Sequence, residues 1–353
     1  MSLEFVDIAF SYGSKPVLTG VSFDAAAGEI TCLLGTSGCG KSTLLRIAAG
    51  VLPVQTGRVL LDSTLIATAT ASPPPEARDI GLVFQEGALF PHLSVTENIG
   101  FGIPKDQHRQ KRIDDVLSLL GLQDFAERFP GMLSGGQQQR VALGRALAPA
   151  PRVLLLDEPF ANVDVIIRRA LREQTRQILK ARDAIVVMVT HDPEEAMEIA
   201  DRIVILDEGT IIQNGSAAEI FDEPASVAVG AMFGNSQIVQ GERVSGGILT
   251  DFGHWPATSL KADAPSAEQL DLIVRPEALF IDADRSASSS LSDLTPLRVT
   301  DVKVIGPRQF VTILGKRDQP LKLEVDRETS IAKGDEVVVR PKPGSLHAFP
   351  AKT

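Results

Sequence analysis

The stretch LLGTSGCGKSTLLRIAAG at residues 33–50 places a glycine-rich turn between an apolar run and a segment with helical periodicity. Residues 35–42 fit the pattern G-x-x-x-x-G-K-S/T, which between a strand and a helix is typical of a phosphate-binding loop. Backbone N–H groups of such a loop form a concave nest for an anion, and the helix N-terminus adds positive potential. Lys41 is expected to reach the outer phosphates, and Ser42 is expected to ligand Mg²⁺.

The rest of residues 1–235 alternates apolar strand-like runs with helical periodicity, which is typical of a largely parallel α/β domain. Continuous apolar runs indicate strands buried on both faces. The clearest are EITCLLG (29–35), RVLLLDEP (152–159), AIVVMVTH (184–191) and RIVILDEG (202–209). Helices are predicted at Lys41–Ala49, Gln137–Ala148 and Asp164–Lys180. The three prolines of TATASPPPE (68–76) predict a surface loop, because proline fixes φ and removes a backbone donor.

Composition limits the class of protein. With 353 residues and 44% hydrophobic content, the chain can form two domains and at least one sizeable core. A net charge of -10 and a pI near 5.1 argue against a nucleic-acid partner. Cys32 and Cys39 have neither metal-ligand nor disulfide-framework spacing, so reduced thiols in a cytosolic protein are expected. No signal-like start and no run of about 20 apolar residues occurs, so neither export nor a bilayer span is expected.

Residues 236–353 change in style and predict a small all-β barrel. Its strand patterns, separated by Gly, Pro, Asp and Ser, are DLIVRPEALFI, LRVTDVKVIG, QFVTILG, PLKLEVD and DEVVVRP. One inserted residue interrupts the apolar alternation of LRVTDVKV, which predicts a β-bulge near Thr300 or Asp301. The composition of DADRSASSSLSD (282–293) predicts a flexible loop.

Two acidic residues form a second candidate site, because Asp157 and Glu158 stand where the apolar run RVLLLDEP ends. Ligands of open α/β sheets bind beyond the carboxyl ends of the strands, which would place both carboxylates beside the glycine turn. Asp157 is expected to belong to the Mg²⁺ shell. Glu158 is expected either to accept a proton from an attacking water or to orient that water. A solvated strand end is the alternative interpretation.

A third candidate is LSGGQQQR at residues 133–140. Ser134, followed three residues later by Gln137, predicts a capping box at a helix start, and two glycines allow close backbone approach. Taken alone, the stretch is an ordinary capped helix. Together with the glycine turn, it predicts a second helix N-terminus that can face an anion.

These motifs together resemble the ATP-binding subunits of ABC transporters, over residues 1 to about 235 and most specifically in LSGGQQQR. The resemblance implies an α/β P-loop NTPase cassette with a mixed sheet and a helical subdomain at about 87–150. An all-β, OB-like barrel would follow at 236–353. It also implies that two copies pair head to tail, each ATP lying between the glycine turn of one copy and the LSGGQQQR helix of the other.

The resemblance also implies roles for individual residues. Tyr12 would stack on adenine beside Val17, Gln85 would ligand Mg²⁺ and link to the membrane subunit, and His191 would contact the γ-phosphate. Without it, Tyr12 is a surface aromatic and His191 a structural histidine. Expected nucleotide contacts are Tyr12, Val17, Gly35, Ser37, Gly38, Cys39, Gly40, Lys41, Ser42, Thr43, Ser134, Gly135, Gly136 and Gln137. Expected catalytic residues are Glu158, His191, Lys41 and Gln85, and expected Mg²⁺ ligands are Ser42, Gln85 and Asp157.

One departure concerns the turn after Glu158, where this chain has ANVD and the family usually has SALD. Asp164 still matches the family's aspartate, so the difference bears on contacts across the dimer more than on catalysis. The segment QEGALFPHLSVTENIGFG (85–102) would either pack within the helical subdomain or line the groove for the membrane subunit's coupling helix.

The β-rich end, with VRPEALFI at 274–281, resembles the accessory domain of bacterial importer ATPases. Arg275 and Glu277 are expected to be structural there. Separate permease subunits, an indirect substrate-binding protein and a location on the cytoplasmic face of the inner membrane follow from the resemblance. The segment VFQEGALFPHLSV most resembles ferric-iron importer ATPases and so favours ferric iron as the substrate, with polyamine, sulfate or sugar as alternatives. A soluble ABC ATPase and a regulatory protein that only binds ATP are the rival functions.

Overall fold

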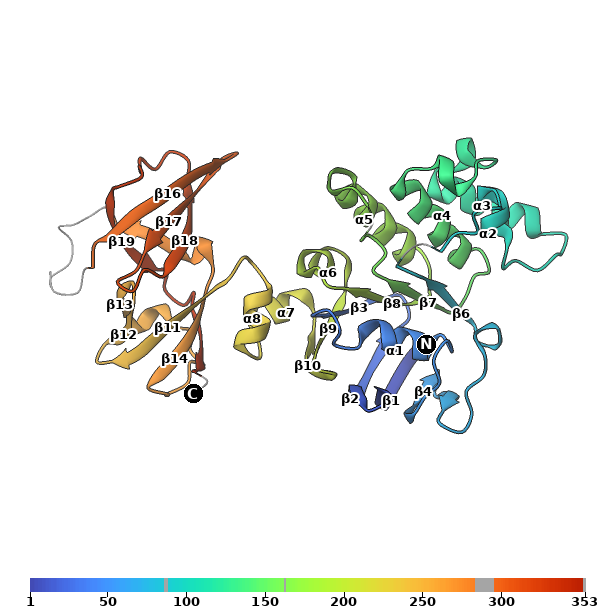
Figure 1. Ribbon diagram of the computed structural model, residues 1–353, viewed down its shortest axis with the longest axis horizontal. Coiled ribbons are helices and arrows are strands. Elements are labelled where there is room, and N and C mark those ends of the chain that lie inside the picture. Colours follow the sequence, from blue (N-terminus) through green and yellow to red (C-terminus); the bar gives the residue numbers. More distant parts are fainter. Residues whose placement is uncertain (86–87, 162, 283–294, 352–353) are drawn as a thin grey trace. The chain divides into compact units, whose positions relative to one another are not determined.

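The computed structural model describes residues 1–85, 88–161, 163–282 and 295–351 (Figure 1). The chain divides into two compact units, Met1–Ile220 and Phe221–Thr353. The functional boundary near residue 235 stays a prediction. Within the described residues, no helix is both long and apolar enough to cross a membrane.

A six-stranded sheet runs through the first unit in the order β10-β9-β3-β8-β7-β6. Its members are β3 (Ile30–Gly35), β6 (Ile80–Val83), β7 (Val153–Asp157), β8 (Ile185–Thr190), β9 (Arg202–Asp207) and β10 (Thr210–Gly215). All neighbouring pairs are parallel except β9 and β10. Every residue of β3, β7 and β8 is buried, so the four continuous apolar runs form strands as predicted.

A separate four-stranded antiparallel sheet, which the sequence did not indicate, has the order β2-β1-β4-β5. Its strands are β1 (Ser2–Tyr12), β2 (Lys15–Ala26), β4 (Thr56–Leu61) and β5 (Thr64–Thr68). Burial alternates along β1, because one face packs on the core and the other faces solvent. The two sheets make the fold mixed, as the resemblance implied.

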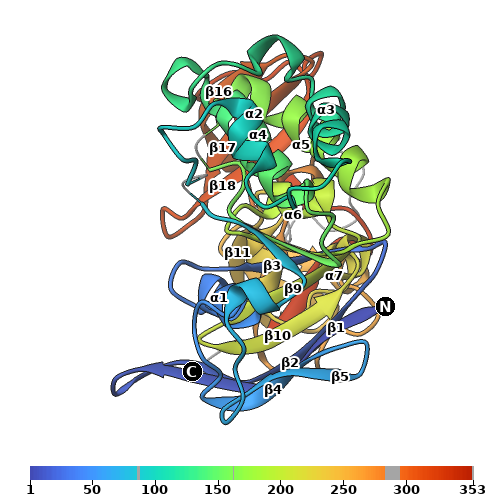
Figure 2. The same cartoon turned by 90° about the vertical axis from the view of Figure 1, so that its right-hand side faces the viewer.

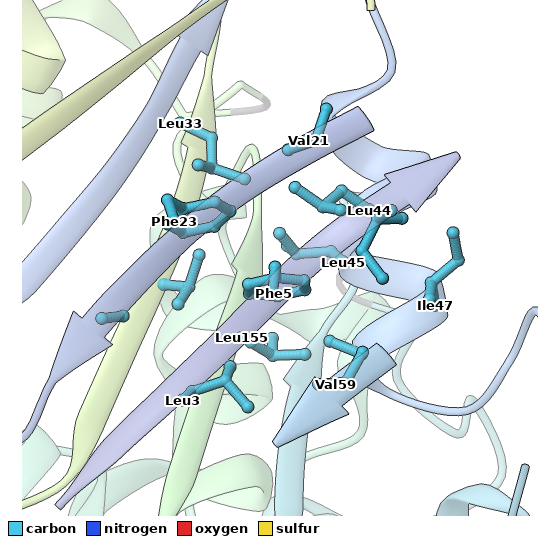
Figure 3. Close-up of a cluster of buried hydrophobic side chains, with 14 of the residues drawn as sticks. Leu3, Phe5, Val21, Phe23, Leu33, Leu44, Leu45, Ile47, Val59 and Leu155 are labelled. Carbon is cyan, nitrogen blue, oxygen red and sulfur yellow. The ribbon is translucent and has the colours of Figure 1, made fainter. Parts of the chain in front are cut away.

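The main core lies between the two sheets and encloses helix α1 (Lys41–Ala48), as Figure 3 shows. Phe5 of β1 stacks on Phe23 of β2 with ring centroids 4.6 Å apart. Leu45 of α1 and Leu155 of β7 are fully buried in the same cluster. Burial of each such side chain contributes about 1.5–3 kcal/mol. The helix that follows the glycine turn is therefore fixed by apolar contacts on several sides.

Helices α2 (Val95–Gly100), α3 (Arg109–Leu120) and α4 (Gly135–Leu147) gather at the end of the first unit opposite β1, β2, β4 and β5 (Figure 1, Figure 2). Helices α5 (Val165–Lys180) and α6 (Pro193–Ile199) follow β7 and β8. Helix α4 begins two residues before the predicted start at Gln137, because Ser134 is its N-cap and the helix starts at the next residue.

The loop predicted at 68–76 is exposed and irregular except at its ends, where Thr68 closes β5 and the short 3₁₀ turn Pro75–Ala77 begins. Just beyond it, Arg78 is buried and its Nη1 donates to the carbonyl oxygens of Ile47 and Ala48, both at 2.7 Å. A guanidinium there satisfies the last carbonyls of α1 and complements the negative end of the helix dipole. No sequence pattern indicated this cap.

The second unit contains two five-stranded antiparallel sheets, β13-β12-β11-β14-β20 and β15-β19-β16-β17-β18. The first holds β11 (Gln237–Val244), β12 (Gly247–Thr250), β13 (Gly253–Pro256), β14 (Gln269–Val274) and β20 (His347–Pro350). The second holds β15 (Leu279–Asp282), β16 (Leu297–Ile305), β17 (Arg308–Leu314), β18 (Pro320–Asp326) and β19 (Glu336–Pro341). Two short helices, α7 (Ala217–Asp222) and α8 (Val227–Met232), precede these strands, and α7 spans the division between the units.

The predicted β-bulge is confirmed, because the register between β16 and β17 shifts between Val299 and Asp301. Thr300 is the extra residue, and its Oγ1 donates to the carbonyl oxygen of Thr312 at 3.1 Å. The bulge keeps Val302 against the barrel core, whereas Val304 is 55% exposed. The flexible loop predicted at 282–293 lies, apart from Asp282, outside the described residues.

Candidate nucleotide site

The phosphate loop (residues 35–42) connects β3 directly to α1. Helices α2, α4, α5 and α6 each have a side chain that caps the N-terminus. Among the described residues, neither α1 nor α3 has such a cap, and the first turn of each carries no acidic residue. The first N–H groups of α1 and the positive end of its dipole are therefore available to an anion.

Glycine is required at two positions of this loop by space as well as by conformation. A Cβ added to Gly35 would lie 2.1 Å from the carbonyl oxygen of Leu206. Gly40 has φ of 106°, and its added Cβ would lie 2.5 Å from Leu18 Cδ2 and 2.9 Å from the carbonyl oxygen of Val17. Backbone of β2 and β9 therefore packs directly on the loop and fixes its path.

Lys41 is 5% exposed and points back over the loop. Its ammonium donates to the carbonyl oxygens of Gly35 at 2.8 Å and Thr36 at 2.9 Å, and lies 3.7 Å from Cys39 Sγ. These contacts hold a positive charge at the centre of the loop. That position suits an interaction with bound phosphate oxygens.

Asp157 ends β7 beside the first turn of α1, where Ser42 Oγ donates to its Oδ1 at 2.7 Å. The Asp157 side chain is 3% exposed, and burial raises the pKa of its carboxyl group. A nearby cation would offset the cost of that buried charge. The hydroxyl and carboxylate oxygens match the hard ligands that Mg²⁺ prefers, alongside water and phosphate oxygens. These residues therefore fit Mg²⁺ in donor chemistry.

Glu158 has φ of 45°, a left-handed conformation that is rare outside glycine and clusters at functional sites. Its Oε2 accepts a hydrogen bond from Gln85 Nε2 at 3.2 Å and lies 3.1 Å from His191 Nδ1. Gln85 follows β6 and His191 follows β8, so three strand ends bring these side chains together. The sequence predicted each residue separately, and the structure places them within hydrogen-bonding distance.

Tyr12 lies next to the phosphate loop at the end of β1. Its hydroxyl is 3.5 Å from Thr43 Oγ1, its ring packs edge-on against Phe10 at 5.0 Å, and its side chain is 49% exposed. Val17, on the adjacent strand β2, is half-buried. An exposed aromatic face beside the first turn of α1 is compatible with base stacking, which stays a prediction.

The signature turn (residues 133–140) contains the predicted capping box at the start of α4. Ser134 N–H donates to Gln137 Oε1 at 2.9 Å, and Gln137 N–H donates to Ser134 Oγ at 3.4 Å. Ser134 and Gly135 are exposed, whereas Gly136 is buried and its added Cβ would lie 3.1 Å from Ile167 Cδ1 of α5. The turn therefore faces outward beside the first turn of α5.

Within the described part of the chain, no hydrogen bond or ion pair joins residues 134–137 to residues 35–43. The structure thus gathers the glycine turn, Asp157, Glu158, Gln85 and His191 into one site and leaves the signature turn outside it. Sequence patterns also missed an ion-pair group beside His191. Arg172 of α5 binds Asp192 and Glu195, and only the close helical spacing of the two carboxylates could have indicated it.

Comparisons with known proteins identify the family of this chain. The family model described as ABC transporter matches residues 18–161, and the TOBE domain model matches residues 272–349. The sulfate/thiosulfate import ATP-binding protein CysA of Bacillus cereus is 36% identical over 97% of both chains. The corresponding protein of Methylococcus capsulatus is 44% identical over 70% of this chain and 72% of its own.

Solved structures agree on the fold of the cassette. The cbiO1 protein of Clostridium perfringens, part of the ABC transporter complex cbiONQ, has a TM-score of 0.57 and 30% identity over 63% of this chain and 91% of its own. A dimer of the ATP-binding cassette MJ0796 in a post-hydrolysis state with ADP and Pi has a TM-score of 0.53. It is 29% identical over 61% of this chain and 98% of its own.

A phosphate loop, an acidic strand end and a separate capped signature turn define an ATP-binding cassette. The chain belongs to the ATP-binding subunits of ABC importers and carries a C-terminal TOBE domain. Its reaction is therefore ATP hydrolysis. The predicted fold and family are confirmed. The prediction of ferric iron as the substrate is not supported, because these relatives are named for sulfate and thiosulfate import.

Replacement of Gly40 by alanine should weaken ATP binding by about tenfold or more, because the left-handed residue and its displaced neighbours cost about 1–3 kcal/mol. Titration calorimetry with Mg²⁺ and ATP measures the change. Gly131→Ala is the matched control, since Gly131 has no heavy atom within 4 Å of the added Cβ. Equal ATP affinity in the two variants would contradict the steric account of the loop.

Proposed function

We propose that the chain is the ATP-hydrolysing subunit of an importer for sulfate or a related oxyanion such as thiosulfate, and that it works as a head-to-tail dimer. The observation that carries the dimer is the exposed capping box of α4, which lies outside its own phosphate site. The names and coverage of the relatives support the substrate class.

In this proposal the residues of the phosphate site position the triphosphate and neutralise its charge, which is most of what phosphoryl transfer needs. The N–H groups of the phosphate loop and the Lys41 ammonium bind the phosphate oxygens. Ser42 and Asp157 hold Mg²⁺, which neutralises charge on the phosphates when bound. Gln85 completes that ligand set.

Glu158 orients the attacking water or accepts its proton. His191 Nδ1 lies 3.1 Å from the same carboxylate oxygen that Gln85 contacts, so both side chains restrict the direction in which Glu158 points. The left-handed backbone of Glu158 has the same effect, because its N–H is held by the carbonyl oxygen of Val189 at 3.0 Å.

Replacement of Glu158 by glutamine should leave ATP binding intact and slow hydrolysis by at least about a hundredfold, the usual scale for a general base. Phosphate release under saturating ATP measures hydrolysis, and calorimetry measures binding. Glu173→Gln on α5 is a control, because its side chain contacts Gln177 away from the site. Near-normal turnover in the Glu158 variant would remove that residue from the role.

The face around the signature turn supports a second copy of this chain as the partner. Asp164 caps α5 through Ile166 N–H at 2.8 Å, and the helix then opens with Val165, Ile166 and Ile167. These side chains are 76%, 89% and 45% exposed, and Ile167 lies against Gly136 of the signature turn. A partner whose bound nucleotide contacts Ser134 would also cover the first turn of α5. Burial of these apolar side chains would then favour association.

Replacement of Ile166 by glutamate should weaken ATP-dependent dimerisation by about tenfold or more, because it puts a charge where an apolar side chain is buried in the dimer. Analytical ultracentrifugation in the Glu158→Gln background with Mg²⁺ and ATP gives the dimer constant. Leu65→Glu, on the exposed strand β5, is the matched control. An unchanged dimer constant would exclude the start of α5 from the interface.

A groove on the first unit supports docking of a membrane subunit. It has a volume of about 500 Å³ and lies between β6 and the helical region, with Phe84, Ala88, Phe90, Phe101 and Arg145 among its lining. Phe90 and Phe101 pack with ring centroids 4.3 Å apart, and Arg145 Nη1 donates to the carbonyl oxygen of Ala88 at 2.8 Å. Phe101 is 61% exposed, which suits the apolar face of an amphipathic helix.

Docking in this groove would place the chain at the cytoplasmic face of the membrane. It would also connect the groove to the nucleotide, because Gln85 stands between β6 and residue 88 and contacts Glu158. A substrate-binding protein would then act only through the permease. Residues 86–87 of the predicted groove segment lie outside the described residues.

Ferric iron is the second candidate substrate, because the segment VFQEGALFPHLSV at residues 83–95 resembles ferric-iron importer ATPases. A deletion strain separates the two. Loss of growth on sulfate or thiosulfate as sole sulfur source, restored by the wild-type chain but not by Glu158→Gln, is the expected result. Loss of growth only under ferric-iron limitation would favour the second candidate, and normal growth in both media would reject both substrates.

A further inference from the structure

Arg172, on the third turn of α5, is the centre of a buried ion-pair group. Its side chain is 8% exposed and contacts three carboxylates. Nη2 donates to Asp192 Oδ2 at 2.6 Å and to Glu195 Oε2 at 3.1 Å, and Nη1 donates to Glu198 Oε2 at 3.3 Å. All three acceptors precede or belong to α6, so this one side chain fixes α5 against the start of α6.

The contact with Asp192 bears on the nucleotide site, because Asp192 directly follows His191 in the sequence. Its Oδ1 caps α6 by accepting from the N–H groups of Glu194 at 3.0 Å and Glu195 at 3.4 Å, while its Oδ2 accepts from Arg172. Its own N–H donates to Thr190 Oγ1 at 3.0 Å. The backbone on either side of His191 is thus held by β8, by α6 and by Arg172.

These contacts close a ring through the catalytic pair. Asp164, six residues after Glu158 in the sequence, caps α5. Eight residues later, about 12 Å along a helix, Arg172 binds Asp192. His191 then contacts Glu158 through Nδ1 at 3.1 Å. The side chain that positions the water is therefore connected to His191 both directly and by way of α5.

We propose that Arg172 is a positioning residue that couples the start of α5 to the orientation of His191, so that a second copy that contacts the start of α5 also affects the His191 contact. This inference rests on the proposed head-to-tail dimer. The side chain of Arg172 is buried and contacts carboxylates of α6 and its N-cap, so its effect on the site passes through other residues. Through its contact with Asp192, Arg172 links the position of α5 to the position of the backbone beside His191.

The charges of this group indicate that protonation of a carboxylate can weaken its contact with Arg172. One guanidinium faces three carboxylates, and burial raises the pKa of Glu195 from its ordinary 4.5 to about 7, although the Arg172 charge lowers it. For Asp192, burial acts in the same direction, but the hydrogen bond and charge of Arg172 leave the pKa lowered overall. Thr190 of β8 and the thiol of Cys32 on β3 also face Glu195, and Arg169 lies 3.8 Å from Glu198.

A double-mutant cycle tests the coupling. Arg172→Lys keeps the charge but loses the forked geometry that serves several carboxylates at once. It should lower kcat about ten- to hundredfold in the wild-type background, the scale of a small misplacement of a catalytic group. With His191→Ala already present, the same change should cost less than about twofold, because residues that act as a unit are not additive.

Single-turnover hydrolysis, which follows slow variants, measures all four members of the cycle. Arg169→Lys is the matched control, since that arginine lies on the same helix with a side chain that is 88% exposed. Equal losses in the two His191 backgrounds would mean that Arg172 acts on stability alone and would overturn the proposal. Wild-type protein without ATP turnover or dimerisation would instead reject the proposed function.

A pH profile gives a second readout that does not depend on the lysine variant folding. As pH rises through about 7, Glu195 becomes charged and binds Arg172 more strongly, so the kcat ratio of wild type to Glu195→Gln should rise. The contribution of Glu195 to the free energy of unfolding changes with pH in the opposite direction to this kcat ratio. Its folded pKa is raised, so that contribution falls between about pH 4.5 and 7.

Glu194→Gln, an exposed neighbour on the same helix, is the control for this profile and should show a constant ratio to wild type. Thermal unfolding at each pH separates activity from stability. A flat ratio for Glu195→Gln, or one that follows the melting temperature, would overturn the positioning role.

Discussion

The uncapped N-terminus of α1 is the feature on which the rest of the nucleotide site depends. Apolar contacts between two sheets hold the body of this helix, and Arg78 closes its C-terminus. Its first turn carries no acid, and no side chain among the described residues caps it, so the positive end of the dipole faces the phosphate loop. Ser42, in that turn, donates from its Oγ to Asp157 Oδ1, which brings together the two residues proposed to hold Mg²⁺.

Much of the candidate site could be predicted because its residues lie at the ends of elements with strong sequence patterns. The phosphate loop, Asp157, Glu158 and His191 all follow continuous apolar runs, and parallel strands bring their carboxyl ends to one edge. Arg172 could not be found in this way. Its partners lie 20 to 26 residues away along the chain, and nothing in the local pattern of α5 separates it from exposed arginines nearby.

The fold was predictable where a pattern was long or interrupted in a specific way, as the bulge at Thr300 shows. The antiparallel sheet of the first unit was missed because alternation along β1 and β2 does not reveal which strand they pair with. Strands β12, β13 and β20 were missed because each has only four residues, too few for a periodic pattern, and the eight-residue β11 was missed as well. Substrate was the hardest property to predict, because the motifs found in the sequence are those of nucleotide binding.

The proposed division of one reaction between two copies would account for two features of the first unit. The signature turn has a complete capping box, yet Ser134 and Gly135 stay exposed and make no hydrogen bond to the phosphate loop within the described residues. The apolar opening of α5 lies beside that turn, where solvent exposure of three branched side chains carries a cost. In the proposed dimer a second copy would cover both the signature turn and these apolar side chains. Under the proposed coupling, contacts at the start of α5 would then reach His191 through Arg172 and Asp192.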